Sequence, residues 1–199
     1  MISSDTLKAG AETVRRGGVI LYPTETVYGL GGDPTRRTVV ERIRRIKRRS
    51  NGKPMLILTD EWDRVRPWID NVTSLHERLM KESPPLAVTI LFEAEAGALE
   101  AVRAGSPRIG IRCTGNDICR RLINMAEMPI ISTSANTAGA KPPGRFEDVC
   151  SEIISTVDWY VDAGRPLRGR PSTVVAVEEG ELRVLREGAV SRQELERIR

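Results

Sequence analysis

Short apolar runs alternate with helical repeats along most of the chain, and this alternation predicts its elements. Apolar runs predict buried strands at residues 19–22, 55–59, 87–92, 130–132 and 159–161. Residues 108–113 alternate instead, which predicts a strand with Ile109 and Ile111 on one face and Arg108 and Arg112 on the other. The connection Glu-Glu-Gly predicts a hairpin that joins strands at 173–177 and 182–185.

Apolar positions three or four residues apart predict helices between these strands. They cover residues 7–14, 34–49, 116–125 and 146–153, with two short helices in 60–82 and a closing helix after the capping pair Ser191 and Glu194. Asp33 and Pro34 are the expected N-cap and first residue of the second helix. That helix should end near Ser50, because Asn51 and Gly52 break the repeat. Residues 95–106 stay ambiguous, with a short helix as one interpretation.

The order of these elements predicts the fold class. Strands that alternate with helices, together with one hairpin, are typical of an α/β domain with a mixed sheet. A chain of 199 residues is long enough to bury a core, so we expect one domain over residues 1–199. No apolar run approaches the roughly 20 residues that span a bilayer, and the N-terminus lacks the apolar core of a signal peptide. We therefore expect a cytoplasmic protein without a membrane partner.

Composition restricts the possible chemistry. The three cysteines have no CxxC spacing, so they predict buried apolar side chains rather than a disulfide framework or a zinc site. His76 is the single histidine, and we expect it on a solvated helix surface; one histidine excludes a multi-histidine metal site and disfavours a hydrolase triad. A net charge of +4 and a pI near 9.2 favour an anionic partner, either a nucleotide or a polynucleotide.

The segment YPTETVYGLGGD at 22–33 is the first candidate site. Hydroxyl and carboxyl side chains follow a buried strand, and glycines at 29, 31 and 32 follow them. This pattern is typical of a ligand site at the carboxyl end of a strand, and also of an ordinary glycine-rich turn.

Three further groups of polar residues could each bind a ligand or have an ordinary structural role. Lys47, Arg49 and Lys53 lie where a helix leads into a strand, which suits a bound phosphate or carboxylate, or a solvated tip. Arg108 and Arg112 form an exposed face or the wall of an anion pocket. The segment STSAN at 132–136 suits phosphate or ribose oxygens, or forms a turn closed by its own hydroxyls.

Six segments together resemble one known family, the YrdC-like threonylcarbamoyl-AMP synthases, in its single-domain form. They occur in the family's order and spacing: YPTETVYGLGGD (22–33), KRRSNGKP (47–54), RIGIRC (108–113), STSAN (132–136), DAGRPLRGRPST (162–173) and LREG (185–188). The chain departs from the usual family pattern at residues 84–87 and at Pro171. Longer members carry an additional C-terminal domain, which is not expected here because the chain ends at Arg199.

The resemblance implies a fold and a reaction. The fold is a twisted mixed β-sheet flanked by helices, with a large concave basic cavity. The reaction converts L-threonine, bicarbonate and ATP, accompanied by Mg²⁺, to threonylcarbamoyl-AMP and pyrophosphate. A downstream threonylcarbamoyl transferase complex then modifies certain tRNAs.

The resemblance also implies roles for individual residues. Lys47 and Arg49 should contact the triphosphate of ATP, with Lys53 as a weaker third contact. Threonine should be bound by Thr24, Arg112 and Ser172. The opposite wall of the nucleotide site should consist of Ser132, Ser134, Asn136 and Arg186. The substrates supply the nucleophile themselves, so no catalytic side chain and no protein metal ligand are expected.

Two alternatives remain at this stage. The first is a non-catalytic module that binds double-stranded RNA or tRNA, although a chain with 4% aromatic residues has few stacking side chains. The second is a carbamoyl adenylate chemistry like that of related domains in hydrogenase-maturation proteins, which are parts of much longer chains.

Overall fold

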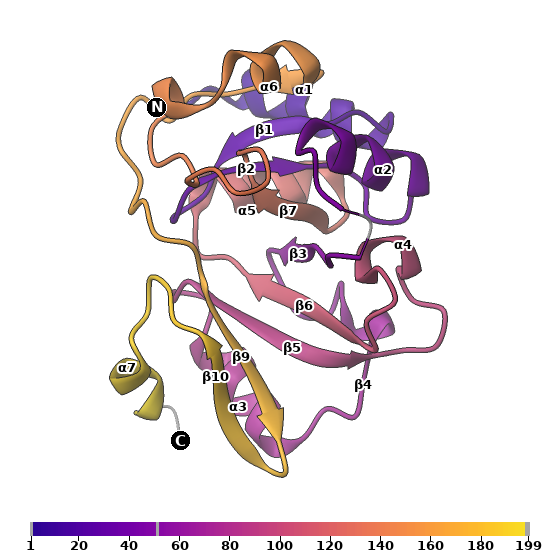
Figure 1. Ribbon diagram of the computed structural model, residues 1–199, viewed down its shortest axis with the longest axis vertical. Helices are drawn as coiled ribbons and strands as arrows, with labels where there is room; N and C mark the ends of the chain where they lie inside the picture. The colour runs from indigo at the N-terminus through magenta and orange to yellow at the C-terminus, as the bar shows by residue number, and fades with distance from the viewer. Residues whose placement is uncertain (1, 51, 198–199) are drawn as a thin grey trace.

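A single open, twisted sheet forms the centre of the molecule (Figure 1). The computed structural model describes residues 2–50 and 52–197, so Asn51 of the predicted helix end lies outside the described residues. The strand order is β10-β9-β5-β6-β3-β7-β2-β1-β8, with β4 paired to β5. The strands are β1 Ile20–Pro23, β2 Tyr28–Gly31, β3 Leu56–Thr59, β4 Ile69–Asp70, β5 Val88–Ala94, β6 Arg108–Cys113, β7 Ile130–Ser134, β8 Trp159–Tyr160, β9 Thr173–Glu178 and β10 Glu181–Arg186.

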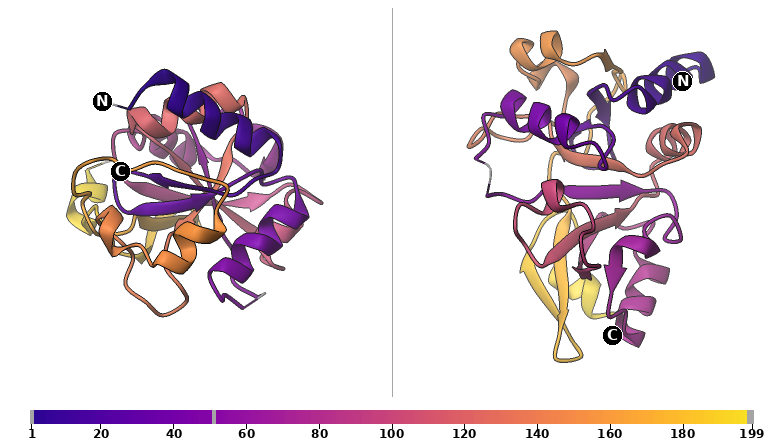
Figure 2. Two further views of the ribbon diagram at one scale, coloured as in Figure 1. Left: turned by 90° about the horizontal axis from the view of Figure 1, so that it is seen from above. Right: turned by 90° about the vertical axis from the view of Figure 1, so that its right-hand side faces the viewer.

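Helices cover both faces of one half of the sheet (Figure 2). α1 and α5 pack on one face, against Ile20, Tyr22 and Ile130, and α2 and α6 lie on the other face. The helices are α1 Ser4–Arg15, α2 Arg37–Ile46, α3 Ser74–Glu82, α4 Glu100–Arg103, α5 Asp117–Ala126, α6 Ser151–Thr156 and α7 Arg192–Glu196, with 3₁₀ turns η1 Arg66–Trp68 and η2 Phe146–Asp148.

The helices on both faces of the sheet explain why the sequence of strand β1 is a continuous apolar run. Ile20 and Tyr22 belong to the core under α1 and α5, whereas Leu21 belongs to the core on the opposite face. A strand that is buried on both faces has no polar side and therefore shows no alternation. The mixed α/β fold predicted from the sequence is confirmed. In the described residues, no helix is long and apolar enough to span a membrane.

Strand β2 was not predicted, because its glycines were interpreted as a turn. Tyr28–Gly31 pairs antiparallel with β1 and with β7. A Cβ atom at Gly31 would lie 2.7 Å from the carbonyl oxygen of Ile131 and 2.8 Å from Cε1 of Tyr22. Gly31 therefore lets β2 pack closely against the Ile131 carbonyl and the Tyr22 ring.

Helix α2 is shorter at both ends than the sequence predicted. The Asp33 carboxylate accepts hydrogen bonds from Thr35 N at 2.9 Å and Thr35 Oγ1 at 2.6 Å, so it closes a turn and the helix begins later, at Arg37. At the other end Arg48 has a positive φ of 50°, which stops the helix at Ile46.

Other local predictions were also wrong in detail. The first helix expected in 60–82 is the 3₁₀ turn η1, and the helix expected at 146–153 is divided into η2 and α6. Residues 100–103 form the short α4 in the ambiguous segment. Cys150 is exposed, contrary to the prediction, whereas Cys113 and Cys119 are buried as expected.

His76 is buried, contrary to the prediction of a solvated side chain. It is 6% exposed, and its ring stacks on Phe92 with the ring centroids 5.0 Å apart. Its Nδ1 atom accepts a hydrogen bond from Thr73 N at 3.2 Å, in a capping box at the start of α3. Burial lowers the pKa of His76, because it disfavours the charged imidazolium.

We predict that His76 makes the fold sensitive to acid. Its folded-state pKa is lowered, so below about pH 6.5 the unfolded chain binds a proton that the folded chain does not. The free energy of unfolding should therefore fall by up to about 1.4 kcal/mol per pH unit in this window. Urea unfolding of wild type and His76→Gln between about pH 7.5 and pH 5.5 measures this slope. Because His76 is the only histidine, two parallel stability curves would contradict the prediction.

Candidate functional site

A cavity of about 310 Å³ lies against the sheet, within the size range of small-molecule sites. Its walls come from strands that are consecutive in the sheet, β10, β9, β5, β6, β3, β7 and β2, and from the loops beside them. Four arginines line it, and the described lining residues include no Asp or Glu. The polar lining residues are Thr24, Thr26, Arg49, Thr89, Ser106, Arg108, Arg112, Ser132, Thr133, Ser134, Ser172 and Arg186.

The turn between β1 and β2 is held by the Thr24 hydroxyl. Thr24 Oγ1 accepts hydrogen bonds from Thr26 N at 3.1 Å and Val27 N at 3.2 Å, and donates to the Val27 carbonyl at 2.7 Å. The Thr26 carbonyl accepts a bond from Gly169 N at 2.8 Å, so this turn also fixes the basic loop 162–173. The predicted site residue Thr24 thus lies in the cavity wall on a rigid turn.

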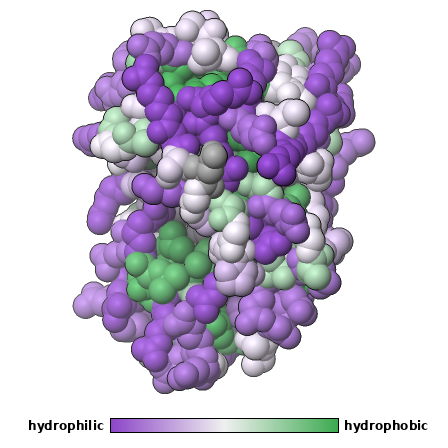
Figure 3. Space-filling view, turned by 45° about the vertical axis from the view of Figure 1, so that its right-hand side comes forward, coloured by the Kyte–Doolittle hydropathy of each residue, from purple (hydrophilic) through white to green (hydrophobic). Residues whose placement is uncertain are grey.

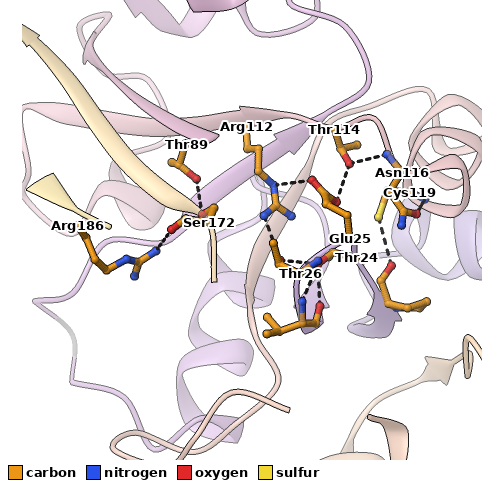
Figure 4. Close-up of polar contacts among 12 residues, drawn as sticks. Thr24, Glu25, Thr26, Thr89, Arg112, Thr114, Asn116, Cys119, Ser172 and Arg186 are labelled. Atoms are coloured by element: carbon orange, nitrogen blue, oxygen red, sulfur yellow. Dashed lines mark hydrogen bonds and ion pairs between the residues drawn. The ribbon is translucent and has the colours of Figure 1, made fainter. Parts of the chain in front are cut away.

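Buried Arg112 at the base of the cavity pairs with Glu25, which is half-buried and lies outside the lining (Figure 4). Arg112 is 3% exposed; its Nε lies 3.7 Å from Glu25 Oε1, and its Nη1 donates to Thr26 Oγ1 at 3.3 Å. Glu25 Oε2 accepts a bond from Thr114 Oγ1 at 3.1 Å. Arg112 Nε and Glu25 Oε1 have no hydrogen-bond partner among the described residues. The pair is therefore loose, and the guanidinium keeps hydrogen-bonding capacity for an anion.

The end of β7 supplies hydroxyl groups to the cavity. Ser132 and Ser134 line it as predicted, and Thr133 lines it as well. Asn136 does not line the cavity; its amide nitrogen donates to the carbonyls of Thr137 at 2.9 Å and Ala140 at 2.6 Å. In this structure Asn136 shapes the loop that follows β7.

Lys47 lies behind that loop and outside the cavity lining. It is 2% exposed, and its Nζ donates to the carbonyl of Ser134 and, at 2.7 Å, to that of Asn136. The Lys47 carbonyl in turn accepts a bond from Ala138 N at 2.8 Å. Burial, with a smaller effect of the charge on Arg49, lowers the pKa of Lys47 to about 7.

Arg49 reaches the cavity, and Lys53 does not. Arg49 Nη2 donates to the Pro54 carbonyl at 2.7 Å, and Nη1 lies 3.4 Å from Thr133 Oγ1. Burial, and secondarily the charge of Arg44, lowers the pKa of Arg49. Lys53 is exposed and outside the lining, so its weaker contact with ATP stays a prediction.

The opposite wall joins Ser172 to Thr89 and Arg186 (Figure 4). The hydroxyls of Thr89 and Ser172 are 2.8 Å apart, and Arg186 Nη2 donates to the Ser172 carbonyl at 2.8 Å. Burial lowers the pKa of Arg186. Both predicted residues, Ser172 and Arg186, line the cavity.

Sequence reasoning missed several residues of this site. Thr26 and Thr133 lie beside predicted site residues, and their hydroxyls were the available signal. Arg108 was not missed: it shares a strand face with Arg112 and lines the cavity, as one of the two interpretations expected, but it pairs with Glu178 at 2.7 Å. Glu25 was visible in the polar run after β1, but its pairing with Arg112 depends on the tertiary structure.

The donor set does not suit a metal held by the protein alone. In the part of the chain that the structure describes, no three His, Cys, Asp or Glu residues are grouped as metal ligands. The cavity offers hydroxyls and arginines, whereas Mg²⁺ favours carboxylate and phosphate oxygens.

The structure is thus a mixed α/β domain whose cavity, lined by arginines and hydroxyls, has the chemistry that suits a small anionic ligand. The sequence profile of the Sua5/YciO/YrdC family, described as "Telomere recombination", matches residues 12–188. The chain belongs to this family.

Three known proteins illustrate the similarity. The threonylcarbamoyl-AMP synthase of Xylella fastidiosa (strain M12) is 30% identical over 184 residues, 92% of this chain and 98% of that protein. The structure of P. abyssi Sua5 complexed with L-threonine has a TM-score of 0.94 and 26% identity; all of this chain is covered, but only 58% of Sua5. E. coli YciO has a TM-score of 0.85 and 25% identity, over 98% of this chain and 94% of YciO.

We predict that Glu25 and Arg112 are energetically coupled. Glu25→Gln leaves the Arg112 guanidinium buried without a carboxylate, which should reduce the free energy of unfolding by about 3 kcal/mol. Arg112→Met should cost a similar amount, but the double variant should lose clearly less than the sum. Urea unfolding of the four proteins measures the coupling. Strictly additive losses would show that the two charges do not stabilise each other.

Proposed function

We propose that this protein is an L-threonylcarbamoyladenylate synthase, a nucleotidyltransferase that forms threonylcarbamoyl-AMP and pyrophosphate from L-threonine, bicarbonate and ATP. The observation that carries the proposal is the convergence of Arg49, Arg112 and Arg186 with hydroxyl groups on one cavity without a carboxylate in its described lining. Family membership and the similarity to the Xylella enzyme support it.

The substrates can supply the reacting groups. The threonine amine and bicarbonate form a carbamate with loss of water. A carbamate oxygen then attacks the α-phosphorus of ATP; a new P–O bond forms, the bond to the β-phosphate breaks, and pyrophosphate leaves with the electron pair. The protein has to align three reactants and stabilise the charge on the phosphates. A cavity built from arginines and hydroxyls suits that task.

The two ends of the cavity suit the two anionic substrates. Arg49, Ser132 and Ser134 would bind the triphosphate, with Arg186 on the opposite wall. Arg112, at the base, would bind the threonine carboxylate, with Thr24 and Ser172 beside it. Lys47 and Asn136 would act near the phosphates, through the carbonyl groups and loop that they hold in this structure.

The reaction would also need a metal ion, a consumer of its product and a suitable compartment. Mg²⁺ would bind mainly through the phosphate oxygens of ATP, where it would neutralise their charge. A downstream threonylcarbamoyl transferase complex would consume the labile product to modify tRNA. The cytoplasm, which holds ATP and tRNA together, is the compartment that this role requires.

We predict threonine-dependent release of pyrophosphate. The purified protein with ATP, Mg²⁺ and bicarbonate should release pyrophosphate when L-threonine is added, and not with other amino acids. Arg49→Ala should reduce this rate roughly 10- to 100-fold, because the variant lacks one charge-assisted hydrogen bond to the phosphates. Lys47→Ala should also reduce the rate, because Nζ no longer holds the carbonyl groups of Ser134 and Asn136.

As matched controls, one lysine and one arginine outside the cavity lining are also replaced by alanine. Lys8→Ala on α1 and Arg78→Ala on α3 change exposed side chains outside the cavity and should keep near-normal rates. If the wild-type protein binds RNA in a salt-sensitive way but releases no pyrophosphate from ATP when threonine is added, the enzyme proposal is wrong and an RNA-binding module is favoured.

We predict that ATP binding places a proton on Lys47. With its pKa near 7, free Lys47 is mostly neutral at pH 8, and nearby phosphates should favour the charged form. ATP binding at pH 8 should then take up close to one proton, and affinity should fall as pH rises above about 7.

Calorimetry in buffers of different ionisation enthalpy measures this uptake. The Lys47→Met variant should bind ATP without this proton uptake. The difference between the two proteins also corrects for protons bound by ATP itself. Equal proton uptake by both proteins would show that Lys47 acts only by holding the loop after β7.

A further inference from the structure

A second basic surface lies outside the cavity, along α2 and next to α4. It consists of two adjoining hollows, which we call the arginine groove. Figure 3 shows hydrophilic side chains over much of the upper half of this face of the molecule. The charged residues of the groove are Arg37, Glu41, Arg44, Arg45, Arg48, Arg49, Glu100 and Arg103.

The positive charge of the groove is only partly neutralised. Arg37 pairs with Glu41, and Arg48 pairs with Glu152, both at 2.8 Å. Arg103 donates to the carbonyls of Ala98 at 2.6 Å and Ser106 at 2.8 Å, which carry no net charge. Among the described residues, four arginines of the groove have no carboxylate within ion-pair distance: Arg44, Arg45, Arg49 and Arg103.

Arg44 lines both hollows together with Arg37 and Glu41, and of these three it is the buried residue. It is 8% exposed, and its Nη2 donates to the Ala101 carbonyl at 2.6 Å. Its Nε is buried without a hydrogen-bond partner among the described residues. A buried guanidinium without a counter-charge is costly, and a bound anion would offset that cost.

The groove shares two lining residues with the central cavity. Arg49 lines the cavity and one hollow, and Ser106 lines the cavity and the other. Arg44 and Arg45 line the same hollow as Arg49, so they are the groove cations that share a hollow with a residue of the cavity. The charge of Arg44 also contributes to the lowered pKa of Arg49, which supports the proximity of the two side chains.

We propose that the arginine groove is a second binding site for a polyphosphate oxyanion, and that it receives pyrophosphate as it leaves the cavity. Arginine forks match phosphate oxygens in pairs, and the recessed Arg44 favours a compact anion over the backbone of a duplex. The identity of the anion as a product rests on the proposed function; the existence of the site does not.

The experiment separates the two sites. Calorimetric titration with pyrophosphate is performed on protein saturated with α,β-methylene-ATP, which fills the cavity. We expect residual binding of one pyrophosphate, with a dissociation constant that rises about 10-fold or more in Arg45→Gln and in Arg44→Gln. The Arg45 side chain is exposed and has no hydrogen bond or ion pair among the described residues, so its replacement tests the groove even where Arg44→Gln fails to fold. Arg78→Gln on α3 is the matched control and should leave the residual binding unchanged.

Each outcome is decisive. Absence of residual pyrophosphate binding, or residual binding that Arg45→Gln does not weaken, overturns the proposal. A labelled RNA duplex that binds through Arg45 and is not displaced by pyrophosphate overturns it in favour of a nucleic-acid surface. Residual binding in a protein that releases no pyrophosphate with threonine supports the groove and refutes the proposed reaction, so the two failures are distinguishable.

Discussion

The close pairing of β7 with its neighbours β2 and β3 is the constraint on which the rest of the structure depends. Gly29 lies opposite Ser134 in β2 and β7, and Leu56 lies opposite Ser132 in β3 and β7. Because Gly31 has no side chain, β2 can lie against the Ile131 carbonyl. This register brings the turn after β1 and the hydroxyls of β7 to one cavity, although more than 100 residues separate them in sequence.

Buried positive charge is the second organising feature. Lys47, Arg49 and Arg112 are each held by neutral carbonyl or hydroxyl groups, and Glu25 alone offers a carboxylate to one of them. Cations in a low-dielectric setting destabilise the folded chain in the absence of an anion, and they interact strongly with one when it binds. A fold that keeps such charges unneutralised favours phosphate and carboxylate ligands, and the same reasoning applies to Arg44 outside the cavity.

Most of the site could be predicted because its residues lie in contiguous motifs. Thr24, Ser132, Ser134, Ser172 and Arg186 line the cavity, and each belongs to a segment that marks the family. The failures have physical causes. His76 has the spacing of a solvated helix position, but its imidazole caps α3 and packs on Phe92. Glycines that permit a turn equally permit two strands to approach closely, and only the neighbouring strand decides between these uses.

The sequence by itself determined the α/β class, the family and the residue types available for chemistry, because periodicity and short motifs are local properties of a chain. The tertiary structure decided which cations are shared between surfaces and which are turned away from the cavity. Arg49 lines both the cavity and the arginine groove, whereas Lys47, two residues earlier, lies behind the loop after β7. Burial and charge pairing depend on the summed positions of distant segments, so adjacent residues with the same charge acquire different roles.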